Sequence, residues 1–122
     1  MSFSLVFCGT PEFAVPSLRA LAADKEFLVK AVITQPDRPV GRSPTPAAPP
    51  VKIAAQELGI PVWQPESLNA ECDTDRCPIS TVRPDFLVVV AYGQILSDAV
   101  LKIVRVAPVN VHASLLPRWR GA

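Results

Sequence analysis

The residues best suited to chemistry lie near the carboxyl end of the chain, at Asn110 and His112. His112 is the only histidine in the sequence, so any chemistry that needs an imidazole must use it. We expect residues 109–112 to form a short strand, in which side chains two positions apart project from the same face. An amide and an imidazole placed together can stabilise negative charge on an oxygen while the imidazole transfers a proton. These residues alone are more often turn chemistry beside a structural histidine than an active site.

The composition describes a folded domain without a strong charge. The 122 residues suit one domain, and 49% hydrophobic with 19% charged residues is typical of a globular protein. A net charge of +1 gives no general attraction to nucleic acids or membranes. The longest apolar run, residues 86–92, is too short to span a bilayer, and the amino terminus lacks the features of a signal peptide. We therefore expect a protein of the reducing cytoplasm.

The cysteines do not indicate a metal centre. Cys8, Cys72 and Cys77 are odd in number, and the spacing of the last two is not a usual zinc-binding spacing. With one histidine available, we expect no metal site.

Apolar stretches alternate with helical patterns along the chain. A helix is expected over residues 51–58 with Gly59 as its stop, and Ser97 and Thr10 are expected to cap two others. A crossover helix near Pro78 is only weakly indicated. The five expected strands are residues 3–8, 27–34, 60–63, 86–92 and 109–112. Because several of these strands are apolar on both faces, the sequence predicts a Rossmann-like, doubly wound α/β fold with a mainly parallel sheet.

Residues 35–50 are rich in proline, so they can form neither a helix nor a central strand. We expect a long surface loop, of the kind that is often functional. In a doubly wound sheet, ligands bind at the carboxyl ends of the strands. The segments expected at that edge are Gly9-Thr10, Gln35-Pro36, Tyr92-Gly93 and His112-Ala113-Ser114. The first turn has no dinucleotide-binding or P-loop motif, which disfavours a nucleotide-binding function. Ser114 is not in a nucleophile elbow, which disfavours a serine hydrolase.

Five separated motifs occupy residues 7–18, 34–42, 50–52, 89–96 and 110–122, and they include Gly-Thr-Pro-Glu-Phe-Ala, Tyr-Gly-Gln-Ile-Leu and Asn-Val-His-Ala-Ser-Leu-Leu-Pro. Together these motifs resemble the methionyl-tRNA formyltransferase family. The Asn-x-His and Ser-Leu-Leu-Pro parts are shared with other formyltransferases. Residues 9–11 and 34–38 favour the tRNA enzyme.

The resemblance implies transfer of a formyl group from 10-formyltetrahydrofolate to the amino group of methionyl initiator tRNA, a step of translation initiation. Asn110 and His112 would stabilise the oxyanion, and His112 would take part in proton transfer. The residues that would contact the folate are Tyr92, Gly93, Ile95, Leu96, Ser114, Leu115, Leu116 and Pro117. Those that would contact tRNA phosphates are Arg38, Arg42 and Lys52.

Departures from the family pattern concern the loop and the carboxyl end. After Arg42 the loop reads Ser-Pro-Thr-Pro-Ala-Ala, which lacks the usual glycine and lysine and predicts weaker tRNA binding. Residues 1–122 match the amino-terminal portion of the catalytic domain. The family's downstream aspartate and carboxy-terminal tRNA-binding domain are not in this sequence. We therefore expect a sheet that is incomplete at its carboxyl end, marginal stability and little or no activity of the chain alone.

Other functions are compatible with these residues. The chain could be a non-catalytic folate-binding remnant. It could also belong to a 10-formyltetrahydrofolate hydrolase or to a formyltransferase acting on a small amine. For the full-length protein, the resemblance implies a monomer.

Overall fold

The computed structural model describes residues 2–39, 41–42 and 44–111. Its main sheet has the strand order β5-β2-β1-β6-β7, and all neighbouring strands are parallel. The strands of this sheet are β1 (Phe3–Gly9), β2 (Phe27–Ile33), β5 (Val62–Trp63), β6 (Phe86–Val90) and β7 (Ala107–Val111). The helices are the 3₁₀ helix η1 (Glu12–Ala14), α1 (Val15–Ala23), α2 (Pro50–Glu57), α3 (Leu68–Glu71), α4 (Pro78–Val82) and α5 (Asp98–Leu101). The predicted doubly wound α/β fold is confirmed.

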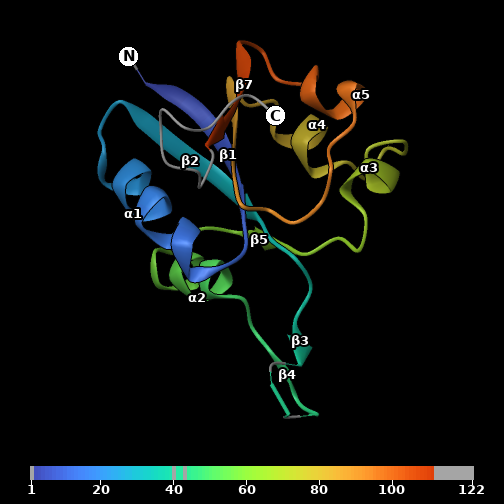
Figure 1. The fold of residues 1–122 in the computed structure, drawn as a ribbon. Coiled ribbons are helices and arrows are strands. Elements are labelled where there is room, and N and C mark those ends of the chain that lie inside the picture. The colour runs from blue at the N-terminus through green and yellow to red at the C-terminus, as the bar shows by residue number, and fades with distance from the viewer. Residues whose placement is uncertain (1, 40, 43, 112–122) are drawn as a thin grey trace, which may run out of the picture.

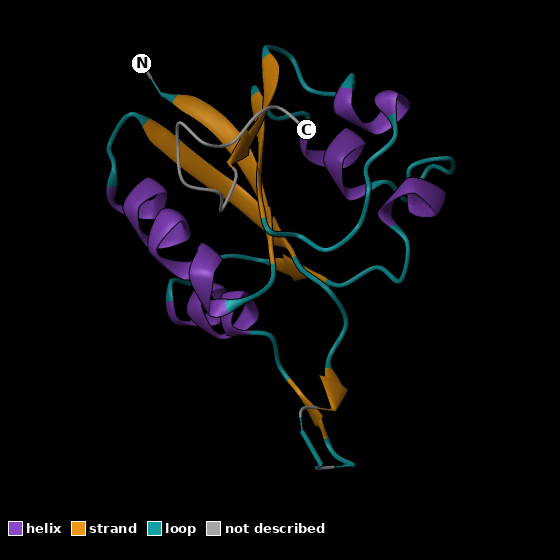
Figure 2. Cartoon of the chain, viewed as in Figure 1, coloured by secondary structure: helices purple, strands orange, loops and turns teal. Residues whose placement is uncertain are grey.

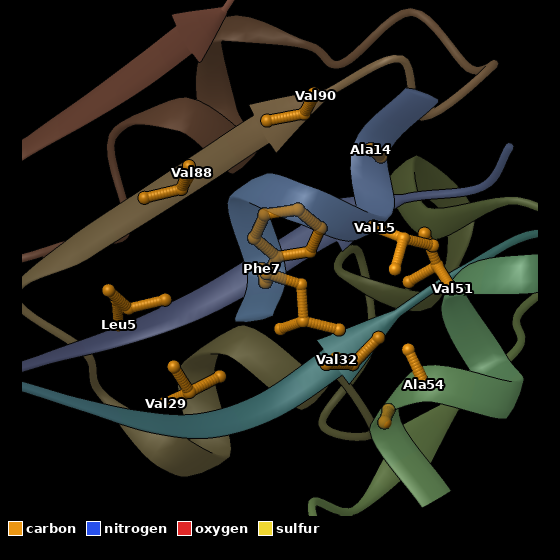
Figure 3. Packing of buried hydrophobic residues seen from close by; sticks show 12 residues of the cluster. Leu5, Phe7, Ala14, Val15, Val29, Val32, Val51, Ala54, Val88 and Val90 are labelled. Carbon is orange, nitrogen blue, oxygen red and sulfur yellow. The ribbon is translucent and has the colours of Figure 1, made fainter. Parts of the chain in front are cut away.

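Helices cover both faces of the sheet. Figures 1 and 2 show α1 and α2 on one side and α3, α4 and α5 on the other. The alternation of side chains along β1 explains this arrangement, because Leu5 and Phe7 belong to the core beneath α1 and α2, whereas Val6 and Cys8 belong to the core beneath the other helices. Figure 3 shows Phe7 near the middle of the first core. All four β1 side chains are fully buried, as expected for the central strand of a parallel sheet.

The elements differ from the sequence prediction at several ends. The strand expected over residues 86–92 stops at Val90, because Ala91 adopts a left-handed conformation with φ 53°. The prediction that Thr10 caps the first helix was wrong, since Pro11 precedes η1 and no side chain caps it. Ser97 does cap α5, where its hydroxyl accepts a hydrogen bond from the Val100 amide at 3.2 Å.

The weakly indicated crossover consists of two short helices, α3 and α4, instead of one. Pro78 lies in the first turn of α4, where a missing N–H costs nothing. A Cys72–Cys77 disulfide closes the loop between these helices. The cysteine spacing was considered only for metal binding, so this disulfide was not predicted.

The proline-rich segment forms a small antiparallel ribbon that projects away from the body (Figure 1). Its strands are β3 (Arg38–Pro39) and β4 (Pro46–Ala47). Apart from Pro50, the first residue of α2, the segment contributes neither a helix nor a strand of the main sheet, as predicted, but its local pairing was not predicted. We call β3, β4 and the residues between them the hairpin.

In the part of the chain that the structure describes, β7 pairs on one side only, with β6. Val109 and Val111 of this edge strand are 42% and 40% exposed. Together with Leu21, Phe27 and Phe86 they line an apolar cavity of about 410 Å³, next to α1. The sequence predicted a sheet incomplete at its carboxyl end, and within the described residues β7 is the edge strand at that end. Among the described residues, no helix is long and apolar enough to cross a membrane.

Candidate active site

Three strand ends are joined at the carboxyl edge of the sheet by the hydroxyl of Thr10. Thr10 follows β1, and its hydroxyl donates a hydrogen bond to the backbone carbonyl of Tyr92, just beyond β6, at 2.6 Å. The same oxygen accepts a hydrogen bond from the Gln35 amide, just beyond β2, at 3.4 Å. The expected convergence of these segments is therefore observed, and Thr10 holds them together instead of capping a helix.

The side chains of Gln35 and Gln94 connect the loops that follow β2 and β6. Gln94 Nε2 donates to Gln35 Oε1 at 2.8 Å, and Gln94 Oε1 accepts from the Leu68 amide at 3.0 Å. Between them lies Gly93, whose φ is +101° and whose Cβ position would be 2.7 Å from Gln35 Nε2. Only glycine fits this position, because any side chain would be strained and would displace the Gln35 amide.

The turn formed by residues 94–97 is also fixed by α3. Asn69 Nδ2 donates to the Ile95 carbonyl at 2.8 Å, and Asn69 Oδ1 accepts from the Ser97 amide at 2.9 Å. The turn is thus held by amide side chains on both sides, although Ile95 itself is 91% exposed.

Asn110 lies on β7 opposite Val89 of β6, and it lines a cavity of about 400 Å³. We call this the amide cavity, because two amide side chains, Asn110 and Gln94, lie among its otherwise apolar walls. Its lining residues are Val89, Gln94, Ile95, Leu96, Leu101, Pro108, Val109 and Asn110. Three predicted site residues, Ile95, Leu96 and Asn110, are therefore brought together.

His112, Ser114, Leu115, Leu116 and Pro117 lie outside the described residues. The structure therefore leaves their predicted roles untested.

A second cavity, of about 650 Å³, lies between the ends of β1, β2 and β6 and the base of the hairpin. We call it the hairpin cavity. Its polar lining includes Thr10, Glu12, Gln35 and Arg38, and its apolar lining comes largely from prolines and alanines. Gly93 lines this cavity while its neighbour Gln94 lines the amide cavity, so the turn after β6 separates the two spaces.

The predicted folate contact Tyr92 is 1% exposed, and its side chain packs in the core beneath α4 and α5. Its hydroxyl has no hydrogen-bond partner within the described residues. Burial, and to a smaller extent the neighbouring Cys8, raise the pKa of Tyr92, so it stays neutral. Burial likewise raises the pKa of the Cys8 thiol, which makes it a poor nucleophile.

The predicted tRNA contacts lie on and near the hairpin. Arg38 is largely exposed and is 3.9 Å from Glu66, and Arg42 is exposed near the tip. Lys52 lies at the base of the hairpin instead, and its ammonium is 3.1 Å from Asp37. This pairing occupies a lysine that the sequence had suggested for phosphate contact.

Asp37 is the anchor of the hairpin base. Gln64 Nε2 donates to Asp37 Oδ1 at 2.7 Å, and Lys52 Nζ donates to both carboxylate oxygens at 3.1 and 3.2 Å. Hydrogen bonds from Gln64 and Lys52 lower the pKa of Asp37 below its ordinary value. The carboxylate is therefore ionised at neutral pH.

The sequence prediction placed Gln35 at this edge without a role for its side chain, and it did not single out Gln64, Asn69 and Gln94. A usable signal was present for Gln35 and Gln94, because each is an amide residue placed just after an apolar strand. Nothing in the pattern marked Asn69, whose partners come from a distant turn. Among the described residues, no cluster of histidine, cysteine or carboxylate side chains is placed to hold a metal ion.

Residues 3–122 match the sequence profile of a family described as formyl transferase. The chain belongs to the formyl transferase family. A methionyl-tRNA formyltransferase of Stenotrophomonas maltophilia (strain R551-3) is 58% identical over 118 residues, which cover 97% of this chain and 37% of the relative. One of Halorhodospira halophila is 54% identical over 122 residues, covering 100% of this chain and 38% of the relative. This formyl transferase chain thus spans just over a third of the length of those relatives.

Solved structures show the same fold at much lower identity. A phosphoribosylglycinamide formyltransferase from Brucella melitensis superposes with a TM-score of 0.66 at 20% identity, covering 99% of this chain and 62% of that one. One from Bacillus halodurans gives a TM-score of 0.64 at 20% identity, covering 93% and 58%. These likenesses bear on the formyl transferase fold alone.

Proposed function

We propose that this chain provides part of a methionyl-tRNA formyltransferase, which transfers a formyl group from 10-formyltetrahydrofolate to the amino group of methionyl initiator tRNA in translation initiation. The observation that carries the proposal is the 58% identity to a protein of that name over 97% of this chain. The family match over residues 3–122 includes every residue of both cavities and the hairpin. Such a protein works in the cytoplasm, and we propose that it acts as a monomer when complete.

The amide cavity suits the donor. At about 400 Å³, it falls within the usual size range of ligand pockets, and apolar walls with a few polar groups are typical of them. Ile95, Leu96 and Val109 offer surfaces for a flat ring, while the amide of Asn110 can donate and accept hydrogen bonds. The donor itself would supply a formyl carbon that an amine can attack.

In this proposal, Gly93, Ile95 and Leu96 shape the donor side through the turn. Tyr92 contributes its backbone, because its ring is in the core. Ser114, Leu115, Leu116 and Pro117 contribute further contacts to the folate.

The hairpin cavity suits the acceptor end of the tRNA. It borders the amide cavity through the turn after β6, so a group bound there is close to a group bound beside Asn110. Arg38 and Arg42 extend from this cavity along the hairpin, where they can contact phosphates. Lys52 would contact a phosphate from the base of the hairpin, and it would then give up its ion pair with Asp37.

Asn110 and His112 would carry the chemistry. The amide N–H of Asn110 would donate a hydrogen bond to an oxygen on which negative charge develops, which stabilises that charge. His112 would share this task and move a proton from the attacking amine. Because a carboxylate partner usually fixes the tautomer of such a histidine, residues 1–122 alone are proposed to show little or no turnover.

A chimera tests the proposal. Residues 1–122 would be followed by the remaining portion of the Stenotrophomonas maltophilia relative, and formylation of methionyl-tRNA would be measured with 10-formyltetrahydrofolate. Activity is expected for the chimera, and a loss of about 100-fold or more is expected for its Asn110→Ala variant. Residues 1–122 alone provide the control for turnover. An inactive, folded chimera would contradict the proposal.

The alternative is a folate-binding remnant without catalysis, which the amide cavity alone would also permit. Calorimetric titration of tetrahydrofolate into residues 1–122 distinguishes the two when combined with the chimera. Binding to the chain together with an inactive chimera would favour the remnant.

A further inference from the structure

The loop between α3 and α4 is closed by the disulfide between Cys72 and Cys77, five positions apart. Cys72 is half-buried and directly follows α3, whereas Cys77 is fully buried and directly precedes α4. Inside the loop, the Thr74 hydroxyl donates to the Glu71 carbonyl at 2.7 Å and accepts from the Arg76 amide at 3.1 Å. These local bonds shape the exposed loop that the disulfide closes.

Helix α3 transmits the position of this loop to the turn formed by residues 94–97. Its first two residues make three hydrogen bonds to that turn, from the Leu68 amide to Gln94 and between the Asn69 side chain and the backbone of Ile95 and Ser97. A helix of four residues is unstable by itself, so α3 depends on its attachments. Those attachments are the buried Leu68 side chain, the turn, and the disulfide at its carboxyl end.

We propose that Cys72 and Cys77 are a redox modification site that controls how firmly α3 holds the turn formed by residues 94–97. The disulfide joins the residue that follows α3 to the buried residue that precedes α4. Reduction removes that attachment and leaves α3 with fewer constraints, so the turn and the amide cavity that it lines become more mobile. The consequence for formyl donor binding rests on the proposed function, whereas the coupling between disulfide and turn does not.

The chemistry is thiol–disulfide exchange with a small thiol or disulfide such as glutathione. A glutathione thiolate attacks the more accessible Cys72 Sγ, which breaks the protein disulfide and releases the Cys77 thiolate. A second glutathione thiolate then attacks the glutathione sulfur of the mixed disulfide and releases the Cys72 thiolate. Two protein thiols and one glutathione disulfide are the products, and the reverse sequence oxidises the pair. In a reducing cytoplasm, where the proposed function places the protein, disulfides are usually transient or redox-sensing.

Hydrogen exchange of the whole chain tests the coupling, with the oxidised protein compared with the protein in dithiothreitol. On reduction, the amides of Leu68 and Ser97, which donate to side chains in this interface, are expected to exchange on the order of tenfold faster. Amides of β1 and β6 are expected to keep their rates. Unchanged exchange at Ser97, or an equal acceleration across the whole sheet, would overturn the proposal.

Three variants serve as controls. In the Cys72→Ser/Cys77→Ser double variant, amide hydrogens are expected to exchange as in the reduced protein, and dithiothreitol is expected to leave their rates unchanged. Cys72→Ala, which keeps the buried Cys77, gives the same comparison if the double variant does not fold. In Asn69→Ala, which removes the acceptor of the Ser97 amide, that amide is expected to exchange fast in both redox states.

Reversibility is measured separately by intact mass. Incubation of the reduced chain with oxidised glutathione is expected to restore the disulfide, seen as the loss of two hydrogen atoms. A reduced pair that does not close again would also overturn the proposal. None of these measurements involves folate or tRNA, so a failed formylation assay and a failed redox test are distinct results.

Discussion

Replacement of Thr10 by valine tests the hydroxyl that joins the strand ends. Thr10→Val retains the shape of the side chain but removes the donor to the Tyr92 carbonyl, at 2.6 Å, and the acceptor for the Gln35 amide, at 3.4 Å. The net value of one hydrogen bond is about 1 kcal/mol, and a partly buried carbonyl without a partner adds a further cost. We therefore expect the free energy of unfolding to fall by about 2 kcal/mol.

Urea unfolding followed by circular dichroism measures this loss. For a small protein with a urea m-value of about 2 kcal/mol/M, the midpoint should shift by about 1 M. With an unfolding entropy of about 2.1 cal/mol/K per residue, the melting temperature should fall by about 8 °C.

The matched control is Thr10→Ser, which keeps the hydroxyl and loses only a methyl group. This variant should lose less than about 1 kcal/mol. A valine variant as stable as the wild type, or a serine variant that loses as much as the valine variant, would refute the role assigned to the hydroxyl.

Three further predictions concern single positions. Gly9→Ala should destabilise the protein by about 2 kcal/mol in urea unfolding, because its Cβ would lie 2.8 Å from a backbone carbonyl oxygen of β6. Hydrogen bonds from Gln64 and Lys52 lower the pKa of Asp37, so the pairing with Lys52 should persist below the ordinary carboxyl pKa and be lost as the pH falls through the lowered value. NMR titration of the Lys52 side chain should show this loss of pairing, and the Asp37→Asn variant should lack the transition. Tyr92→Phe should leave the melting temperature unchanged or raised, since the hydroxyl has no partner among the described residues.

Local signals in the sequence predicted the elements that depend on neighbouring residues. The apolar run that includes Val6 and Phe7 predicted the central strand, and Ser97 predicted the start of α5, because strand burial and helix capping act over a few positions. Gly59 follows the C-cap residue of α2 and has a φ of +74°, as expected for a glycine that stops a helix. The resemblance assigned both Asn110 and Ile95 to the active site, and both line the amide cavity.

The features that were missed depend on contacts between distant residues. The Thr10 hydroxyl donates a hydrogen bond to a carbonyl 82 positions away, so its local resemblance to a helix cap was misleading. Tyr92 was assigned to the folate site from its place in a motif, but its ring packs into the core with residues of distant helices, which no local pattern shows. No local pattern shows that Asn69 bonds to a turn 26 or more positions away.

The hairpin is attached to the body through polar contacts at its base, and neither core cluster of the described residues includes a residue between 35 and 50. Asp37, Gln64 and Lys52 form that attachment. Changes near the tip, such as at Arg42, therefore alter the surface offered to a ligand without altering the packing that keeps the chain folded. Evolution can vary recognition and foldability on separate sets of residues in this protein, so the hairpin is the part in which new binding preferences can arise at the least cost to the fold.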